Sequence, residues 1–535
     1  MIHKRLLRTA LLLLSTLLTA CGQSDSPADI AKFCSTLEDV NAGSVNTDKH
    51  PELDGHVLVV EALLRASPDS IRKDLTHIRD TVDAWAGAVS GDRPMIATFE
   101  KLSDPRLIGS EGRVTDFIAK HCGIDLGGPQ WSQAPLDRTQ DVCEGWPRIG
   151  TPNTFNHFPN LPDIAGSNYF SNSFFISKWA ALVGIDTIKG AFVVEPGGKA
   201  VIHGQYPSTR YFAFHPNDMD LNNLRTLRDN ELQPDAGSRN PFLEVLTDTG
   251  QKNYYTATLA FSAEPESPAA NTSYVGLRKD GLSTNPFVMN LLRMYHVDAG
   301  NGAGSGGVPL PALSIYDADG ELVKHFEECD LFAPGIPEFR TPQVFPALPV
   351  IDHRPRNPPQ WTTSSNFDAP SDTLANADAQ YLGTHYSSRF GNIFVVRGKY
   401  LSAPDTRNGQ SPAAAGKEVR LYNLCTYNFW NGGANQCILE NQLLQDEDGF
   451  YTLVVSNEND RPRNLNAQAA TWINWGPYLD GQLQYRYVYR ENPFVAAIAA
   501  AADGKPISKD LEPYVPVAVA CDSETFEQGG WRACF

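Results

Sequence analysis

The chain has 535 residues, of which 41% are hydrophobic and 20% are charged, and its formal net charge at pH 7 is −18. A chain of this length is expected to contain more than one domain. Its acidic balance excludes electrostatic attraction to nucleic acid or to an anionic lipid surface as the mode of binding.

Residues 1–20 have the pattern of a secretory signal. Basic residues occur at positions 4, 5 and 8, and an apolar core runs from Leu11 to Leu18. This core is shorter than the roughly 20 apolar residues that a membrane-spanning helix needs. We therefore interpret 1–20 as a signal peptide, whose removal would leave the mature chain more acidic still.

The segment Leu18-Thr19-Ala20-Cys21 ends the apolar core and resembles the lipobox of bacterial lipoproteins. The resemblance implies that the Cys21 thiol receives a diacylglycerol, that the signal is cut before Cys21, and that the new N-terminus is acylated, for example with palmitate. Several acyl chains anchor a protein far better than a single chain, which binds only marginally. The alternative is an ordinary cleaved signal followed by a chance cysteine.

The residue after the lipobox bears on which membrane is reached. Gly22 occupies the position where an aspartate, in enterobacterial lipoproteins, favours retention in the inner membrane. The resemblance therefore implies the outer membrane of a bacterial cell envelope, contacted through acylated Cys21. Neither the oligomeric state nor the exposed face of that membrane is predicted.

The cysteine count supports export. With Cys21 acylated, an even number of cysteines remains, which in an oxidising compartment favours disulfides. There is no Cys-x-x-Cys and no Cys/His cluster at zinc spacing, so no metal site is expected. The disulfide candidates are Cys34, Cys122, Cys143, Cys329, Cys425, Cys437, Cys521 and Cys534.

Residues 28–125, which follow a lipidated tether at 21–27, are predicted to form a helical bundle. Ser67 is the expected N-cap of its best helix, with Pro68 at the first helical position. Cys34 and Cys122 lie on the first and last helices, and we predict a disulfide between them. The apolar residues of the best helix recur every three or four positions, on one face, at Ile71, Leu75, Ile78, Val82, Trp85 and Val89.

From Cys143 onward, aromatic and β-branched residues alternate and Pro and Gly interrupt often, which is typical of all-β sandwiches or barrels. Pairs of similar segments recur in one order roughly 200 residues apart, which favours a tandem domain duplication. The alternative is that the segments are similar by chance, because residues with high strand propensity form similar short segments in unrelated β proteins. The pairs are AFVVEPGGK (191–199) with IFVVRGK (393–399), TRYFAF (209–214) with VRLYNL (419–424), NYYTATLAF (253–261) with GFYTLVVSN (449–457), and LLRMYHV (291–297) with LQYRYVY (483–489).

The predicted fold class is thus α+β and multidomain. A disulfide-tied helical bundle precedes two tandem all-β domains at 143–333 and 361–535, which a Pro-rich linker at 334–360 connects.

The phrases FVVRGKYLSAPDTR (394–407), VRLYNLCTYNF (419–429), DEDGFYTLVVS (446–456) and INWGPYLDG (473–481) carry a resemblance to a group of uncharacterised bacterial lipoproteins. Those proteins combine a lipobox, a cysteine-tied helical region and a duplicated β region, and no activity is assigned to them. TRYFAFHPND (209–218) resembles jelly-roll domains of other bacterial proteins, which implies a two-sheet sandwich in each half.

No catalytic motif such as GxSxG, HExxH or a P-loop is present. The segment from Asp218 to Asp229 is similar to a calcium loop but lacks its turn glycine and its final glutamate, so a polar turn is the favoured interpretation. Asp-Gly pairs at 319–320 and 448–449 predict hairpin turns. His157, His203 and His215 are noted, but packed or exposed histidines are favoured over catalysts.

Aromatic residues supply the candidate ligand site. Cys425 and Cys437 bracket the loop 426–436, which is rich in aromatic and amide groups, and a disulfide there would hold its shape. Such rings stack on sugars or line apolar pockets, although core packing is the more frequent role for the two later tryptophans. The candidates are Tyr427, Phe429, Trp430, Trp472 and Trp475.

The sequence therefore predicts a lipid-anchored envelope protein that acts as a binding or structural module, without a cofactor. The expected ligand is a glycan or an apolar small molecule, and nucleic acid is not expected. The alternative is a hydrolase of carbohydrate or ester substrates in a β-domain cleft, because paired catalytic carboxylates leave no local signature.

Overall fold

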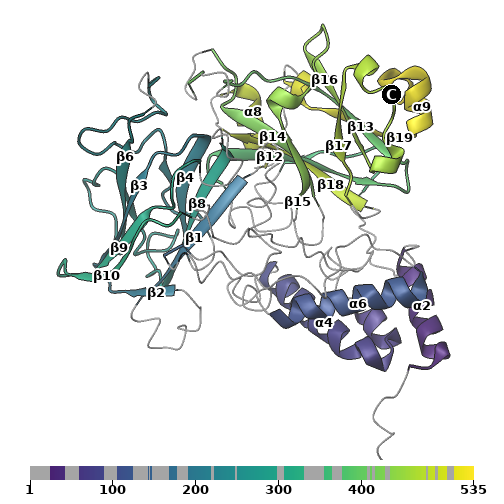
Figure 1. Cartoon of the computed structure of the whole chain (residues 1–535), viewed down its shortest axis with the longest axis horizontal. Helices are drawn as coiled ribbons and strands as arrows, with labels where there is room; N and C mark the ends of the chain where they lie inside the picture. The colour runs from purple at the N-terminus through teal and green to yellow at the C-terminus, as the bar shows by residue number, and fades with distance from the viewer. Residues whose placement is uncertain are drawn as a thin grey trace, which may run out of the picture.

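The structure is a computed structural model (Figure 1). It describes residues 25–41, 60–89, 105–123, 143, 145–146, 168–177, 191–218, 222–246, 250–297, 306–330, 355–363, 376–405, 410–411, 416–427, 434–476, 480–488, 492–502 and 511–535. The predicted signal peptide, Cys21 and most of the predicted linker lie outside these residues.

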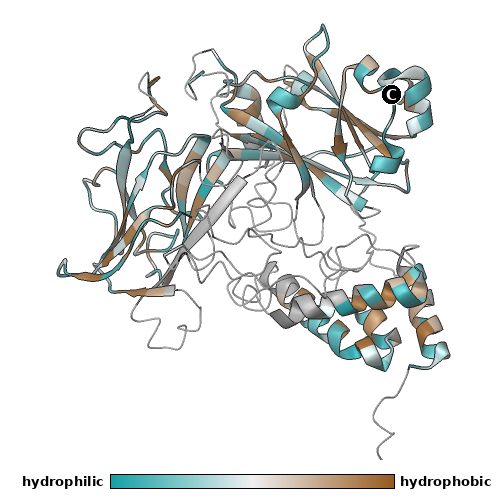
Figure 2. Cartoon of the chain, in the orientation of Figure 1, coloured by the Kyte–Doolittle hydropathy of each residue, from teal (hydrophilic) through white to brown (hydrophobic). Residues whose placement is uncertain are grey.

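The N-terminal region is helical, as predicted. Apolar residues at the predicted spacing on one helix, among them Ile71, Leu75 and Ile78, are buried in the core of the bundle. Apolar and polar residues alternate around these helices in Figure 2. The helices are α2 (Pro27–Asn41), a segment at 60–66, α4 (Asp69–Val89) and α6 (Pro105–Cys122).

The predicted N-cap of α4 is wrong. The Ser67 hydroxyl donates to the Leu64 carbonyl oxygen over 2.7 Å, and so closes the end of the preceding helical segment. The backbone N–H of Ser70 instead donates to the Asp25 carboxylate over 3.1 Å. An acceptor that is distant in sequence thus caps the helix, which local spacing does not reveal.

A disulfide joins Cys34 on α2 to Cys122 at the end of α6, with a Cα–Cα distance of 5.3 Å, and confirms the predicted pairing. It closes a segment with a sequence separation of 88, for which the loop-entropy model gives a stabilisation of about 4.6 kcal/mol. The remaining candidates are all paired as well, in the disulfides Cys143–Cys329, Cys425–Cys437 and Cys521–Cys534.

The first β region contains two sheets, with the strand orders β2-β1-β8-β4-β5 and β10-β9-β3-β6-β7. Neighbouring strands are antiparallel except for the parallel pairs β1–β2 and β6–β7. The strands are β1 (Asn168–Ser177), β2 (Ala191–Val194), β3 (Lys199–Gln205), β4 (Thr209–Asn217), β5 (Leu227–Arg228), β6 (Tyr254–Ala260), β7 (Thr272–Tyr274), β8 (Phe287–Val297), β9 (Ala312–Tyr316) and β10 (Leu322–Phe326).

The second β region also contains two sheets, ordered β11-β12-β18-β14-β15 and β17-β16-β13-β19. Its strands are β11 (Thr362–Thr363), β12 (Ala379–Ser387), β13 (Ile393–Lys399), β14 (Leu421–Tyr427), β15 (Ala434–Leu439), β16 (Phe450–Ser456), β17 (Ala470–Asn474), β18 (Asp480–Val488) and β19 (Val517–Cys521). Its helices are α8 (Pro493–Ala502) and α9 (Ser523–Gly529), with 3-10 turns at Glu440–Gln442, Glu458–Asp460, Asn466–Gln468, Glu512–Tyr514 and Trp531–Ala533.

The second region is therefore not all-β as predicted. Helix α8 is rich in alanine, the residue with the highest helix propensity, and its Phe494, Val495 and Ile498 are buried in the core of this region. Among the described residues, no helix is both long enough and apolar enough to cross a bilayer.

The same strand order occurs in both β regions. The run β1-β8-β4-β5 corresponds to β12-β18-β14-β15, and β9-β3-β6-β7 corresponds to β19-β13-β16-β17. The parallel pair β6–β7 has its counterpart in the parallel pair β16–β17.

Two of the four predicted segment pairs fall on equivalent strands, β4 with β14 and β6 with β16. A third pair falls on the equivalent strands β8 and β18. Its sequence alignment is shifted by one residue from the correspondence that the pairing of these strands with β4 and β14 gives. The first pair is wrong, because 191–194 is β2 whereas 393–399 is β13, whose counterpart is β3. The two segments share only the apolar composition of buried strands, which does not distinguish one strand from another.

At equivalent positions of the two β regions, a glycine on one strand lies directly opposite a tyrosine on the neighbouring strand. Gly204 on β3 lies opposite Tyr255 on β6, and Gly398 on β13 lies opposite Tyr451 on β16. A Cβ at Gly204 would come within 2.8 Å of the Tyr255 hydroxyl, and a Cβ at Gly398 would collide with that of Tyr451. Only glycine leaves room for the ring in each sheet.

Candidate functional site: a buried polar interface

The two β regions pack through the sheets that contain β4 and β8 in the first and β12, β14 and β18 in the second, as Figure 1 shows. Residues alternate along each strand, so Phe212 and Phe214 of β4 face the core of the first region while Tyr211 and Ala213 face the second region. The buried apolar part of the interface contains Tyr211, Ala213, Leu291, Tyr295, Ala379, Tyr381, Leu421, Cys425, Tyr427, Cys437 and Val488.

Two arginines cross this interface in opposite directions. Arg420 of β14's N-terminal flank donates to both carboxylate oxygens of Asp229, over 2.8 and 2.6 Å. Arg210 of β4 forms an ion pair with Glu440. Each guanidinium also bonds the other's backbone, because Arg420 Nε donates to the Arg210 carbonyl over 2.7 Å and Arg210 Nη2 donates to the Arg420 carbonyl over 3.0 Å.

The acceptors of these arginines are also equivalent. Asp229 accepts the backbone N–H of Phe212 over 2.8 Å, and Glu440 accepts that of Tyr422 over 3.3 Å. Asp229 follows β5, and Glu440 follows β15. Reciprocal contacts of this kind are those of an isologous interface, so the two regions are related by an approximate two-fold axis near Arg210 and Arg420.

All four charged groups are buried: the side chains of Arg210 and Glu440 are 1% and 2% exposed, and those of Arg420 and Asp229 are 7% and 0% exposed. Burial raises the pKa of Asp229 and of Glu440, because the arginines offset only part of the desolvation. A buried carboxylate that loses its arginine is strongly destabilising, at about 3 to 5 kcal/mol. The pairs therefore make correct docking of the two regions a condition of stability.

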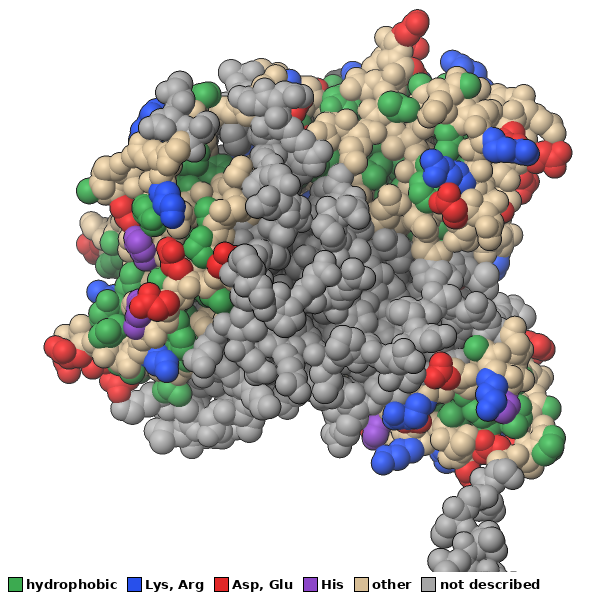
Figure 3. Space-filling view, in the orientation of Figure 1, with side chains coloured by type: hydrophobic (Ala, Val, Ile, Leu, Met, Phe, Trp, Pro, Cys, Tyr) green, Lys and Arg blue, Asp and Glu red, His purple; other side chains and the backbone are tan. Residues whose placement is uncertain are grey.

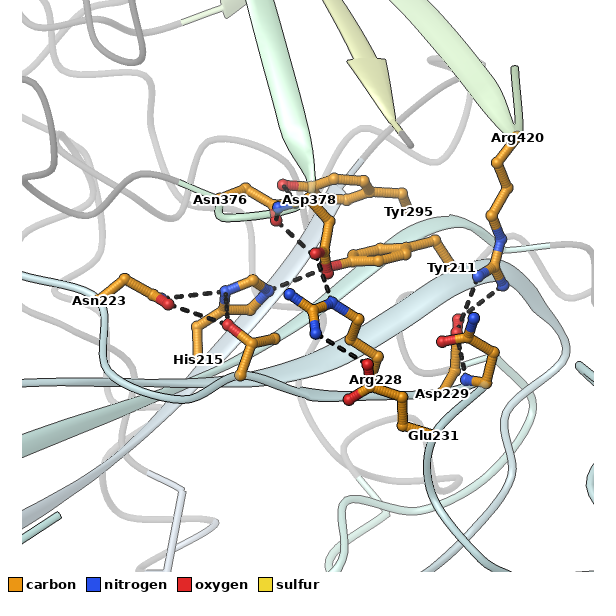
Figure 4. A network of polar contacts seen from close by, with 12 residues as sticks. Tyr211, His215, Asn223, Arg228, Asp229, Glu231, Tyr295, Asn376, Asp378 and Arg420 are labelled. Carbon is orange, nitrogen blue, oxygen red and sulfur yellow. Dashed lines mark hydrogen bonds and ion pairs between the residues drawn. The ribbon is translucent and has the colours of Figure 1, made fainter. Parts of the chain in front are cut away.

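Beside these pairs, a chain of hydrogen bonds runs from the first region into the second (Figure 4). The Tyr211 hydroxyl donates to Asp378 over 2.8 Å and lies 3.0 Å from His215 Nε2. Asn223 Nδ2 lies 3.2 Å from His215 Nδ1. With its single proton directed to Asp378, the phenol accepts from His215 Nε2–H, and Nδ1 accepts from the Asn223 amide.

The far end of this chain is anchored by arginine and tyrosine. Arg228 Nε donates to Asp378 over 2.5 Å, and Arg228 Nη1 donates to Glu231 over 2.9 Å. Asn376 Nδ2 donates to the Tyr295 hydroxyl over 3.0 Å. Asn376 and Asp378 belong to the second region and the others to the first, so the network joins the two regions.

The protonation states agree with these roles. Burial, together with the nearby guanidinium groups of Arg293 and Arg228, lowers the pKa of His215 well below its usual value. Burial and Asp378 raise the pKa of Tyr211 well above its usual value. At neutral pH the imidazole is therefore neutral and the phenol protonated, which suits a structural network more than a proton-transferring site.

The predicted ligand-binding aromatics are placed differently from one another. Tyr427 is buried in the interface and Trp475 in the core of the second region, where its ring centroid is 4.3 Å from that of Tyr386. The Trp472 ring lies under the Arg461 guanidinium at 4.5 Å, and its N–H donates to the Ser456 hydroxyl. Tyr427 and Trp475 are thus buried, and ligand contact stays a prediction for them. Phe429 and Trp430 lie outside the described residues, so their role stays a prediction.

The aspartate motifs are turns and caps where they are described. Asp317 and Asp446 each accept two backbone N–H groups within their own turns, as the predicted hairpin turns require. Asp218 accepts the backbone N–H groups of Asn222 and Lys279, while Asp229 binds Arg420. The described residues contain no group of three or more potential metal ligands.

The noted histidines also differ in placement. His203 is half exposed, stacks on Tyr254 and lies 3.3 Å from an Asp235 oxygen, whereas His215 is buried in the interface. His157 lies outside the described residues.

The sequence reasoning missed the interface arginines. A signal was present, because TRYFAF and VRLYNL both carry arginine at their second position, Arg210 and Arg420. An arginine within an otherwise apolar strand pattern is costly to bury without a partner, so its recurrence indicates a buried ion pair.

A scan against protein-family models and a search of curated proteins found no match. Among solved structures, an uncharacterised protein from Burkholderia cenocepacia shares 12% identity over 85% of this chain and 99% of that chain, with a TM-score of 0.38. A protein from Vibrio parahaemolyticus shares 10% identity over 71% of this chain and 92% of that chain, with a TM-score of 0.29. Likenesses this distant assign neither a family nor an activity.

Proposed function

We propose that the chain is a lipid-anchored protein of the bacterial cell envelope whose two β regions act together as one binding or structural module. The observation that supports a single module is the pair of reciprocal, buried arginine–carboxylate contacts between Arg210 and Glu440 and between Arg420 and Asp229. Separation of the regions would expose or orphan these charges, so the pair is expected to move as one body.

Each β region is best interpreted as a jelly-roll-like two-sheet sandwich. The core of the first region combines Phe212 and Leu292 of one sheet with Ile202 and Leu259 of the other. Side chains that meet from two sheets are the defining feature of a sandwich core.

The anchor is assigned to Cys21 on the strength of the lipobox resemblance. Helix α2 begins at Pro27, so the tether is short, and a fully extended chain spans at most about 3.5 Å per residue. The helical region would therefore sit within about 20 Å of the membrane surface. On the face in Figure 3, acidic and basic side chains are interspersed over the described residues. We therefore assign attachment of the protein to the membrane to the lipid on Cys21.

Metabolic labelling tests the anchor. Cells that express the chain are grown on a radiolabelled fatty acid, and membrane and soluble fractions are compared for wild type and Cys21→Ser. We expect label and membrane association in the wild type, and both lost in the variant. An unlabelled wild-type protein would disprove the anchor, and label retained in the Cys21→Ser variant would place it elsewhere.

The proposed ligand is a glycan or an apolar small molecule at the disulfide-bracketed loop 426–436. A thermal-shift screen against glycans, lipids and calcium identifies a binder, and Phe429→Ala with Trp430→Ala is then compared with Phe390→Ala, an exposed aromatic on another loop. Loss of binding only in the 429/430 variant supports this loop. Unchanged binding there would count against it.

A further inference from the structure

The outer face of the sheet β10-β9-β3-β6-β7 carries a cluster of polar and aromatic side chains. This sheet lies on the side of the first β region that is away from the second (Figure 1). His203 of β3 lies 3.3 Å from a carboxylate oxygen of Asp235, and its ring stacks on that of Tyr254 with the centroids 5.4 Å apart. The Thr256 hydroxyl donates to the same Asp235 oxygen over 3.1 Å. We name these four residues the His203 cluster.

An equivalent cluster exists in the second β region. Its position follows from the glycine–tyrosine pairs of the two regions, which the two clusters flank in the same order. Arg397 replaces the histidine, forms an ion pair with Asp446 and donates to the Thr452 hydroxyl over 3.2 Å. In both clusters the backbone N–H of the aspartate donates to the carbonyl of the aromatic residue. The matched residues are Arg397 with His203, Asp446 with Asp235, Thr452 with Thr256, and Phe450 with Tyr254.

The two clusters differ in what covers them. In the second region, the C-terminal segment 523–535 packs on the outer face of the sheet, and the Trp531 ring lies over the Arg397 guanidinium at 4.1 Å. The side chain of Arg397 is 13% exposed, whereas that of His203 is 48% exposed. Both carboxylate oxygens of Asp446 are bonded, one to two backbone N–H groups and the other to Arg397. The same cluster is thus closed in the second region and open to solvent in the first.

The open cluster has unused hydrogen-bonding groups. Among the described residues, no hydrogen bond is made by His203 Nδ1, by Asp235 Oδ1 or by the Tyr254 hydroxyl. Because Asp235 lies beside His203 Nε2, the proton of the neutral imidazole is assigned to Nε2, and Nδ1 is an acceptor. The imidazole and the carboxylate therefore offer two acceptors to hydroxyl donors. The stacked rings add an apolar face of negative charge density, which attracts C–H groups.

We propose that the His203 cluster is a binding site for one ring of a neutral glycan on the outer face of the first β region. A sugar ring combines a face of C–H groups with a rim of hydroxyl donors, and the cluster matches both. The Asp235 carboxylate disfavours an anionic ligand. An indole of the chain itself occupies the equivalent place in the second region, so the fold accommodates a flat ring at this position.

This site is separate from loop 426–436. The inference rests on the proposed binding role only for the class of ligand, which it narrows to a neutral glycan.

Calorimetric titration of the full-length protein in detergent tests the site with the trisaccharides of glucose, mannose and N-acetylglucosamine as separate probes, and with trigalacturonate as an anionic comparison. We expect saturable binding of at least one neutral probe and weaker binding of trigalacturonate. His203→Ala and Asp235→Asn should each weaken binding of the neutral probe about tenfold, as for loss of a hydrogen bond. The matched control His325→Ala removes an exposed imidazole of the same sheet that already contacts Ser314 and Glu327, and should bind as wild type does.

Binding of no neutral probe by the wild type, equal affinity for trigalacturonate, or wild-type affinity in both His203→Ala and Asp235→Asn would overturn the proposal. If the variants do not fold, the wild type decides. A bound neutral probe should slow the modification of His203 by diethyl pyrocarbonate but not that of His325, and an unchanged rate at His203 refutes the site.

The loop 426–436 is distinguished by its own variant. Phe429→Ala with Trp430→Ala should leave binding of the trisaccharide at the His203 cluster unchanged. Binding that is lost in that variant but kept in His203→Ala would place the glycan at the loop and refute the site proposed at His203.

Discussion

In the first β region, the Thr226 hydroxyl lies 3.3 Å from His215 Nδ1 across the β4–β5 edge, whereas at the equivalent edge of the second region Cys425 on β14 and Cys437 on β15 are joined by a disulfide. The positions correspond, because His215 and Cys425 follow the paired arginines by the same number of residues. Thr226 and Cys437 likewise precede Asp229 and Glu440 by the same number.

The difference shows two ways of fixing one edge of a sandwich. Both cysteines of the disulfide belong to the second region, so this bond does not depend on contact with the first region. The hydrogen bonds of His215 continue through Tyr211 to Asp378 of the other region, so their order depends on the docking of both. We therefore expect the first region to rely on the interface more than the second does, and the following variants test that asymmetry.

The largest effect is expected for the arginines that both regions share. Arg420→Gln leaves Asp229 buried without its partner and should lower the free energy of unfolding by about 3 to 5 kcal/mol, and Arg210→Gln should do the same through Glu440. Urea denaturation followed by far-UV circular dichroism measures both. Arg463→Gln, which breaks an exposed pair with Glu527, is the control and should leave the free energy of unfolding almost unchanged. Equal losses in all three variants would contradict the buried role.

The disulfide comes next. Replacing both Cys425 and Cys437 with serine opens a short loop and should cost about 3 kcal/mol in the chain-entropy model. Hydrogen exchange should rise at β14 and β15 and stay unchanged at β4. A comparable rise at β4 would show that the two edges are not independent.

Tyr211→Phe removes the hydroxyl that links His215 to Asp378 and should cost about 1 to 3 kcal/mol. Tyr386→Phe is the matched control, because its buried hydroxyl donates to the Trp475 carbonyl within one region. Calorimetry should show the two β regions unfolding at more separated temperatures in Tyr211→Phe than in Tyr386→Phe. Identical profiles would indicate that the hydrogen-bond chain does not couple the regions.

The smallest effect is a pH dependence carried by His215. Its pKa in the folded protein is lowered, so the unfolded chain binds the proton more readily. The contribution of His215 to the free energy of unfolding is therefore complete above the pKa of the unfolded chain, about 6.5. It declines as the pH falls below that value, by at most about 1.4 kcal/mol per pH unit. Unfolding of wild type and His215→Gln between pH 7.5 and 5 measures it, and the difference between them isolates His215 from Asp229 and Glu440. A slope that is the same in both proteins would exclude this role.

Several features could be predicted because they depend on neighbours in the sequence. The spacing of Ile71, Leu75 and Ile78 predicted the buried face of α4, and the Asp-Gly pairs predicted hairpin turns. Other features failed where the outcome depended on distant partners. Asp25 caps α4 in place of Ser67, and the first of the four predicted segment pairs falls on strands that are not equivalent. The candidate site was missed for the same reason, since Arg210 meets Glu440 only after two sheets have docked.

The local sequence by itself determined the apolar face of α4, the prediction of strands after Cys143 and the arginine that recurs in TRYFAF and VRLYNL, because each arises from periodicity and propensity within a few residues. Which carboxylate each arginine meets was decided only by the tertiary structure. Those arginine–carboxylate contacts join residues about 190 to 230 positions apart, and their free energy depends on burial that exists only once the two β regions have come together.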